Sequence, residues 1–270
     1  MTNFQKRAVE LTSTAVAGQA SFIITRLSQQ KPSTTRFTYE GGFHSEFLRS
    51  RGFFGYEDFW NLPHDFVDDI NYRKGGWSGV SVLNLWDKNS QRNYYVKRQV
   101  NQFRYSLKKP FGALTFEYEA EAIARSQALG LPAIDIACWG VRREAGSTMG
   151  LLVTEEIGFS SLEDILATQK FSPTLGVLLY RCGEQLLEMH SHGIQHGALY
   201  PKHIFVDQHS GAIKLIDFER SRKKGSIHKA MRADLRQLLK HLKALPHKVI
   251  EMLLSPYQKK HSRLLSDLQS

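Results

Sequence analysis

The chain has 270 residues, of which 41% are hydrophobic and 23% charged, an ordinary balance for a globular protein that buries a core. No apolar run approaches the ~18 residues of a membrane-spanning helix, which argues against an integral membrane segment. The net charge of +10 indicates an anionic partner, such as acidic lipid, phosphorylated glycan, nucleotide or nucleic acid, or else a basic surface that only aids solubility. No nucleic-acid-binding motif is present, so we expect no nucleic-acid partner.

The first part of the chain carries few local signals. Residues 1 to about 35 are weakly patterned, and we expect a helix or a mobile arm in the N-terminal segment 1–40. Glu10 interrupts any hydrophobic stretch ahead of the small residues at 15–20, which disfavours a signal peptide. Aromatic residues are dense between 43 and 66, which predicts that this segment packs on the body of the protein. Cys138 and Cys182 lie in apolar runs, which is typical of buried thiols rather than of disulfides or zinc ligands.

A glycine-rich stretch follows at residues 71–80. It predicts two strands joined by a turn, and the backbone amides of such a turn can contact phosphate groups. The candidate nucleotide-binding residues here are Gly75, Gly76, Ser78 and Gly79. The alternative is a purely structural hairpin, since paired glycines also favour tight turns.

A strand lysine and an acidic helix come next. Residues 94–98 read as a strand that carries Lys97, and residues 115–129 read as a helix that carries several glutamates. We expect Glu119 to form an ion pair with Lys97, because Ala122 and Ile123 then face inward at helical spacing. The alternative is an ordinary acidic helix face.

Two flanking segments complete the first half of the chain. A basic and aromatic insertion at 101–112 separates the lysine strand from the helix; its cations include Arg104, Lys108 and Lys109. Two buried strands are predicted at 134–141 and 149–154. The residues after the second strand, including Glu155 and Ile157, take the position where a kinase binds adenine through its backbone.

The stretch 196–217 organises the rest of the chain. A long apolar helix that opens at Pro173 leads into a loop beginning with His196, and a short hairpin then delivers Asp217 at the end of its second strand. This is the layout of a protein-kinase catalytic loop followed by the metal-binding aspartate. In that layout Ala198 takes the position of the catalytic aspartate and His203 that of the metal-binding asparagine.

Taken together, these motifs resemble the lipopolysaccharide kinase (Kdo/WaaP) family, in particular its InaA-like branch. The resemblance covers residues 59–240 and rests on five short stretches in a fixed order, which lie at 59–63, 73–80, 97–99, 115–119 and 199–203. It implies an α+β, protein-kinase-like two-lobed fold with a small antiparallel-sheet N-lobe and a compact helical C-lobe. We expect the N-lobe at 41–156 with its aromatic lead-in, and the C-lobe with the catalytic-like loop at 157–270.

The resemblance also implies a function. It predicts an ATP-dependent kinase that phosphorylates a lipopolysaccharide-core or related sugar hydroxyl on the cytoplasmic side of the inner membrane, with an anionic glycan as acceptor and peripheral contact with the anionic membrane. Lys97 and Glu119 would position the ATP phosphates, and His203 and Asp217 would hold Mg²⁺. The alternative is a pseudokinase, a nucleotide-responsive binding module in envelope stress, because Ala198 lacks the carboxylate.

Two residues near the loop have open roles. His196 is a candidate substitute base, although this histidine is usually a packing residue in kinases. Glu219 is either a metal ligand or, as we prefer, a surface carboxylate paired with Arg220 or Arg222.

Overall fold

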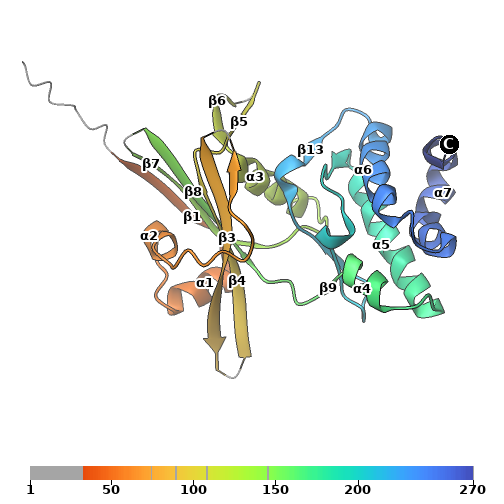
Figure 1. Ribbon diagram of the computed structural model, residues 1–270, viewed down its shortest axis with the longest axis horizontal. Helices are drawn as coiled ribbons and strands as arrows, with labels where there is room; N and C mark the ends of the chain where they lie inside the picture. The colour runs from red at the N-terminus through yellow and green to blue at the C-terminus, as the bar shows by residue number, and fades with distance from the viewer. Residues whose placement is uncertain (1–32, 74, 89, 108, 145, 270) are drawn as a thin grey trace, which may run out of the picture. The chain divides into compact units, whose positions relative to one another are not determined.

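The computed structural model describes residues 33–269 except 74, 89, 108 and 145, with side chains described up to His261. Residues 1–32 lie outside this range, and so does most of the expected N-terminal arm. Residues 32–270 cluster as one compact unit, in which an antiparallel sheet precedes a group of helices (Figure 1). The predicted combination of a strand-rich N-lobe and a helical C-lobe is confirmed.

A six-stranded antiparallel sheet forms the N-lobe, with strand order β1-β7-β8-β4-β3-β2. Its strands are β1 (Thr34–Tyr39), β2 (Asn71–Arg73), β3 (Gly76–Asp87), β4 (Ser90–Val100), β7 (Ile136–Glu144) and β8 (Ser147–Glu155). β1 falls inside the segment predicted as an arm, and this part of the prediction is wrong. Its six residues pair with β7 from Thr34 opposite Arg143 to Tyr39 opposite Cys138, so hydrogen bonds to a distant strand hold it in place.

Side chains along β4 alternate between the two faces of the sheet. Tyr94 and Val96 are fully buried in a hydrophobic cluster with Phe47 and Phe59. Lys97, one residue further on, therefore points to the opposite face of the sheet. In register, it lies between Val80 of β3 and Leu152 of β8.

The aromatic segment packs on the body of the protein, as predicted, and it covers the face of the sheet opposite Lys97. Its helices are α1 (Gly42–Ser50) and α2 (Tyr56–Trp60), which supply Phe47 and Phe59 to that cluster. Arg98 is fully buried beneath them, and its guanidinium donates to the backbone oxygens of Phe59 and Leu62 and to Ser81 Oγ. A buried guanidinium needs partners for its N–H groups. These bonds supply the partners and tie the backbone at residues 59–62 to β4.

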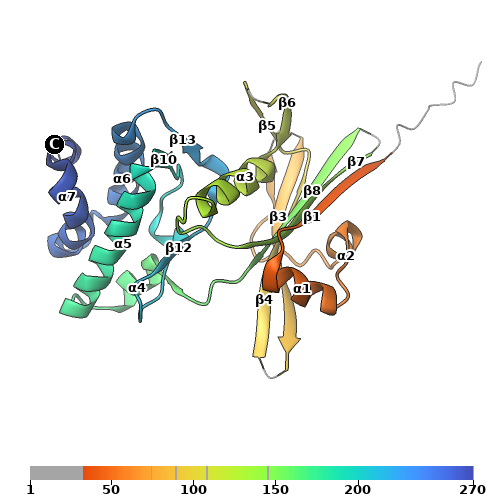
Figure 2. The ribbon, with the colours of Figure 1, turned by 180° about the vertical axis from the view of Figure 1, so that it is seen from behind.

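The basic insertion is a hairpin that leads into a helix. Strands β5 (Phe103–Ser106) and β6 (Lys109–Leu114) pair with each other, and α3 (Thr115–Gln127) begins directly after them. Leu114, Phe116 and Ile123 join α3 to the main hydrophobic core, which extends into the C-lobe. Figure 2 shows α3 beside the sheet on the side of the C-terminal helices.

Four helices and several short strands make up the C-lobe. The helices are α4 (Leu162–Thr168), α5 (Pro173–Ser191), α6 (Ile227–Leu242) and α7 (His247–Gln269), with 3₁₀ turns η1 (Pro201–His203) and η2 (Phe218–Arg220). The strands are β9 (Ser160–Ser161), β10 (Ile194–Gln195), β11 (Ile204–Val206), β12 (Ile213–Leu215) and β13 (Arg222–Lys223). No helix within the described residues is long and apolar enough to cross a membrane.

Hydroxyl caps start three of these helices. The side chains of Ser161, Ser172 and Ser226 each accept a hydrogen bond from a backbone N–H in the first turn of α4, α5 and α6. Such caps satisfy donors that have no partner inside the helix. Cys138 and Cys182 are buried free thiols, as predicted.

Candidate nucleotide site

A cavity of about 630 Å³ is lined by residues of both the sheet and the helical part. Its apolar wall is formed by Val67, Val80, Ile134, Leu152, Ile157, Phe159, Phe205 and Ile216. At its polar end lie Lys97, Glu119, His203 and Asp217, which four separate segments contribute. Such a cavity suits a ligand with a flat apolar part and a charged part.

The predicted ion pair between Lys97 and Glu119 is present. Lys97 Nζ lies 2.6 Å from Glu119 Oε2, and both side chains are largely buried. Burial by itself lowers the pKa of Lys97, but Glu119 and Glu219 more than offset this effect, so the pKa of Lys97 is raised and the amine is charged. Burial raises the pKa of Glu119, against the opposing effect of Lys97. The pair fixes a cation at the polar end of the cavity.

Glu219 contacts the same lysine, which corrects the preferred prediction for this residue. Its Oε2 lies 3.7 Å from Lys97 Nζ, and no ion pair to Arg220 or Arg222 is present among the described residues. Glu219 is the middle residue of η2, which begins immediately after Asp217, and this places it beside the lysine. Lys97 therefore has two carboxylate neighbours in the ligand-free protein.

Asp217 follows β12 in a left-handed backbone conformation, with φ of 64° and ψ of 58°. This conformation is uncommon for a residue other than glycine, although aspartate tolerates it better than most. The strand β12 ends two residues earlier, at Leu215, and the Asp217 carboxylate is 38% exposed at the cavity. Strained backbone of this kind occurs preferentially at functional sites.

His203 lies beside Asp217, its predicted partner in holding a metal ion. Its Nδ1 donates to the backbone oxygen of Ala198 at 2.8 Å and lies 3.7 Å from Asp217 Oδ2. When Nδ1 carries the proton, the neutral ring has a free lone pair on Nε2, the arrangement that metal-ligating histidines adopt.

Magnesium fits this site only together with a ligand. No three His, Cys, Asp or Glu side chains converge within the described part of the chain. Mg²⁺ commonly binds through one or two carboxylates together with phosphate oxygens and water. Asp217, assisted by His203, can therefore hold the ion when a phosphate chain supplies further oxygens.

The structure does not support a catalytic role for His196. Its side chain is fully buried, and it packs edge-on against Phe218 with ring centroids 4.8 Å apart. Burial lowers the pKa of His196 to about 4, so the ring is neutral at pH 7. A base must reach the substrate proton, which this buried ring does not do. Ala198 is only 2% exposed but lines a smaller cavity beside Asp217, where its methyl group offers no proton acceptor.

Asp234 on α6 holds the loop, and the sequence analysis missed it. Its buried carboxylate accepts the backbone N–H groups of His196 at 2.6 Å and Gly197 at 2.8 Å, and the His190 ring nitrogen at 3.1 Å. Asp234 lies among Ala230, Met231, Leu235 and Leu238 on the buried face of α6. An acid in an apolar stripe signals a buried hydrogen-bond acceptor, so the pattern was readable.

Removal of this acceptor should destabilise the protein strongly. An Asp234→Ala variant leaves two backbone donors and a histidine without their partner, and we expect a loss of about 3 kcal/mol in the free energy of unfolding. Urea unfolding followed by circular dichroism measures it. Asp65→Ala, at an exposed aspartate, is the matched control. Equal midpoints for the two variants would contradict the role given to Asp234.

The other predicted nucleotide-binding residues divide into two groups. Glu155 and Ile157 line the cavity, as expected of an adenine-binding segment, although the Glu155 carboxylate is engaged by Arg92 at 2.9 Å and His44 at 3.2 Å. Glu155 can therefore serve the ligand only through its backbone.

The glycine-rich hairpin has a different position. Gly75, Gly76, Ser78 and Gly79 are absent from the lining of the cavity. A Cβ at Gly76 would lie 2.1 Å from the backbone oxygen of Val100, and one at Gly79 would lie 2.5 Å from the Phe66 ring. Both glycines are thus required for close packing, and the prediction that their amides contact phosphates stays a prediction.

Comparison with known proteins identifies the family. The model of the lipopolysaccharide kinase (Kdo/WaaP) family matches residues 57–257, which is most of the chain. The chain belongs to this family. It is 32% identical to Protein InaA of Escherichia coli (strain K12) over 200 residues, which span 71% of this chain and 91% of InaA.

One solved structure gives a weaker match. The Cydia pomonella granulovirus kinase PK-1 is 11% identical, with a TM-score of 0.38 over 60% of this chain and 55% of the viral chain. This similarity is too low to support any detail of the site. Membership of the lipopolysaccharide kinase (Kdo/WaaP) family, together with the Lys97–Glu119 pair and the position of Asp217, makes the protein kinase-like.

Proposed function

We propose that this protein binds ATP with Mg²⁺ and transfers the γ-phosphoryl group to a hydroxyl of a lipopolysaccharide-core or related sugar. The observation that carries the proposal is the polar end of the cavity, where the buried Lys97–Glu119 pair lies with the Asp217 carboxylate. A fixed lysine and a metal-binding aspartate are the two charged elements that hold ATP in kinases.

The residues have distinct tasks in this proposal. The apolar wall takes the adenine, and Lys97 binds the phosphates while Glu119 keeps its side chain extended. Asp217 and His203 would hold Mg²⁺, which neutralises charge on the phosphate oxygens when bound. The acceptor oxygen forms a bond to the γ-phosphorus as the bond from that phosphorus to ADP breaks, and the hydroxyl proton is lost.

The proton has no carboxylate acceptor at Ala198, and it leaves to water or to a phosphate oxygen. A positioned base contributes roughly 10²–10⁴-fold to a reaction rate. Phosphoryl transfer has a loose transition state that depends more on positioning and charge neutralisation than on proton removal. The proposal is therefore a slow kinase rather than an inactive one.

A second candidate rests on the same residue. Ala198 places a methyl group at the position where a kinase has its base, and it is almost completely buried. We propose as the alternative a pseudokinase, which binds nucleotide in the same cavity and acts through a partner in envelope stress.

The two candidates are separated by nucleotide titration followed by turnover. ATP binding should be stronger with magnesium than without it in both cases. Release of ADP that depends on added lipopolysaccharide core supports the kinase, and binding without turnover supports the pseudokinase. Absence of ATP binding at millimolar concentration, with and without magnesium, would contradict both.

The β5–β6 hairpin is our candidate for membrane contact. Leu107 and Phe111 project fully into solvent. The predicted cations are more engaged than expected: Arg104 donates to the Glu219 backbone at 2.8 Å, and Lys109 lies 2.6 Å from Glu121. Lys108 lies outside the described residues. We therefore expect apolar insertion at the tip to contribute beside the basic charge.

A flotation assay with anionic vesicles tests this contact. Replacement of both Leu107 and Phe111 by serine should weaken binding about a hundredfold, because each large apolar side chain contributes roughly 1.5 kcal/mol when buried. Val177→Ser, at an exposed position on α5, is the control. Unchanged binding of the double variant would assign membrane affinity to another surface.

A further inference from the structure

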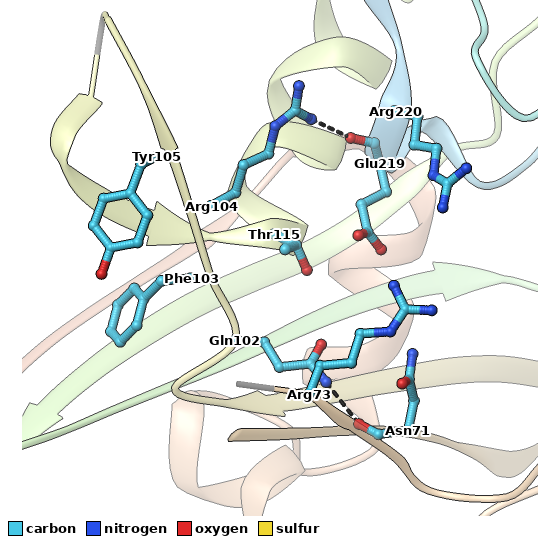
Figure 3. Close-up of a pocket in the computed structure, with 9 residues that line it drawn as sticks. All are labelled: Asn71, Arg73, Gln102, Phe103, Arg104, Tyr105, Thr115, Glu219 and Arg220. Atoms are coloured by element: carbon cyan, nitrogen blue, oxygen red, sulfur yellow. Dashed lines mark hydrogen bonds between the residues drawn. The ribbon is translucent and has the colours of Figure 1, made fainter. Parts of the chain in front are cut away.

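A second cavity, of about 480 Å³, has three arginines in its lining (Figure 3). Arg73 comes from β2, Arg104 from β5 and Arg220 from η2, so three separate segments supply the guanidinium groups. The remaining lining residues are Asn71, Gln102, Phe103, Tyr105, Thr115 and Glu219.

This cavity is connected to the candidate catalytic centre. A smaller cavity of about 280 Å³ contains Ala198, His203 and Asp217. Four lining residues are common to the two cavities, namely Asn71, Arg73, Glu219 and Arg220. A ligand whose hydroxyl lies beside Ala198 and Asp217 can thus extend into the arginine-lined cavity.

The charges in this cavity do not cancel. Within the described residues, neither Arg73 nor Arg220 has a carboxylate within 4.0 Å. Arg104 uses one N–H for the Glu219 backbone oxygen at 2.8 Å, and its guanidinium stacks 4.8 Å from the centre of the Tyr118 ring. Glu219 is the single acid in the lining, and its carboxylate already contacts Lys97 at 3.7 Å.

Positive charge in a concave surface attracts anions, and the planar guanidinium binds phosphate and carboxylate through paired hydrogen bonds. Lys97 does not line this cavity, so phosphates held by the lysine would not fill it. Phe103 and Tyr105 also line the cavity, but their rings point away from the guanidinium group of Arg104, because neighbouring residues of β5 face opposite sides (Figure 3).

We propose that the arginine-lined cavity is a subsite for an anionic substituent, a phosphate or a carboxylate, carried by the acceptor sugar. Arg73 and Arg220 bind the anion, and Arg104 keeps the segment around Glu219 in place. This proposal deepens the proposed function and rests on it, because it places the acceptor hydroxyl beside Asp217.

Binding of defined sugars to the full chain tests the subsite. The nucleotide site is first saturated with Mg²⁺ and a non-hydrolysable ATP analogue, and mannose 6-phosphate, glucuronate, mannose and inorganic phosphate are then titrated separately by calorimetry. We expect both anionic sugars to bind more tightly than mannose. Arg73→Gln and Arg220→Gln should each weaken that binding about tenfold, since a charge-assisted hydrogen bond contributes on this order. The double variant should lose it.

Arg143→Gln is the matched control. This exposed arginine lies on β7, and three strands separate β7 from β2 in the sheet. It should leave the affinity for anionic sugars unchanged. Equal affinity in the wild type and the double variant would overturn the subsite. Equal affinity for inorganic phosphate and mannose 6-phosphate would overturn its assignment to the acceptor.

The proposed function can fail separately. If the ATP analogue does not bind, the nucleotide proposal is wrong, whereas arginine-dependent binding of the anionic sugars would still establish the cavity as an anion site. If the analogue binds but the anionic sugars do not, the nucleotide proposal stands and the subsite is overturned.

Discussion

An Asp217→Asn variant will bind ATP with the same affinity in the presence and absence of magnesium. The wild-type carboxylate repels a free triphosphate, and a bridging cation converts that repulsion into attraction. The uncharged asparagine side chain neither repels the free triphosphate nor binds the bridging cation. Any phosphate transfer should fall by roughly 10²–10³-fold, the range lost when one transition-state charge stabiliser is removed.

Two comparisons make this result interpretable. Asp65→Asn removes the same charge at an exposed position outside the cavity lining and should retain magnesium-dependent binding. The unfolding midpoint of Asp217→Asn should stay close to that of the wild type, because the carboxylate is 38% exposed. If affinity still rises with magnesium in Asp217→Asn, the ion is held elsewhere in the protein.

The Lys97–Glu119 pair was predictable because its signals are local. Alternation along β4 sets the direction of Lys97, and helical spacing along α3 sets that of Glu119. The two elements are joined by a short hairpin, so few arrangements bring a lysine and an acid together.

Other features depend on pairings between distant segments, which local patterns do not encode. β1 joins the sheet through β7, about one hundred residues later in the chain. Glu219 has basic neighbours in sequence, yet its position in η2 places it beside Lys97 on the sheet. The arginine-lined cavity likewise needs three segments to meet.

The loop that carries Ala198 is held by side chains of α6. Asp234 fixes the backbone at His196 and Gly197, and the Gln237 side chain accepts the N–H of Leu199 at 3.0 Å. Both anchors come from α6, so the position of Ala198 is independent of the residue's own side chain. A carboxylate can therefore be introduced at position 198 without removing a contact that holds the loop.

In a slow kinase, an Ala198→Asp variant should phosphorylate its sugar acceptor up to ~10²–10⁴-fold faster than the wild type, the contribution of a positioned base. The new carboxylate would enter the cavity that Asp217 and Lys202 also line, beside the place where we expect the acceptor hydroxyl. Nucleotide affinity should change little, because the nucleotide is held by the sheet, Lys97 and Asp217. Initial rates of ADP release with lipopolysaccharide core as acceptor measure the gain.

Ala198→Asn is the matched control, since it adds similar volume without a proton acceptor and should give no gain. Magnesium-dependent ATP binding in both variants shows that the loop has kept its shape. In a pseudokinase the acceptor groove need not present a hydroxyl at this position, and the Ala198→Asp variant should then remain at background turnover. An equal gain from Ala198→Asn would refute base restoration, because side-chain volume rather than proton transfer would then account for the rate.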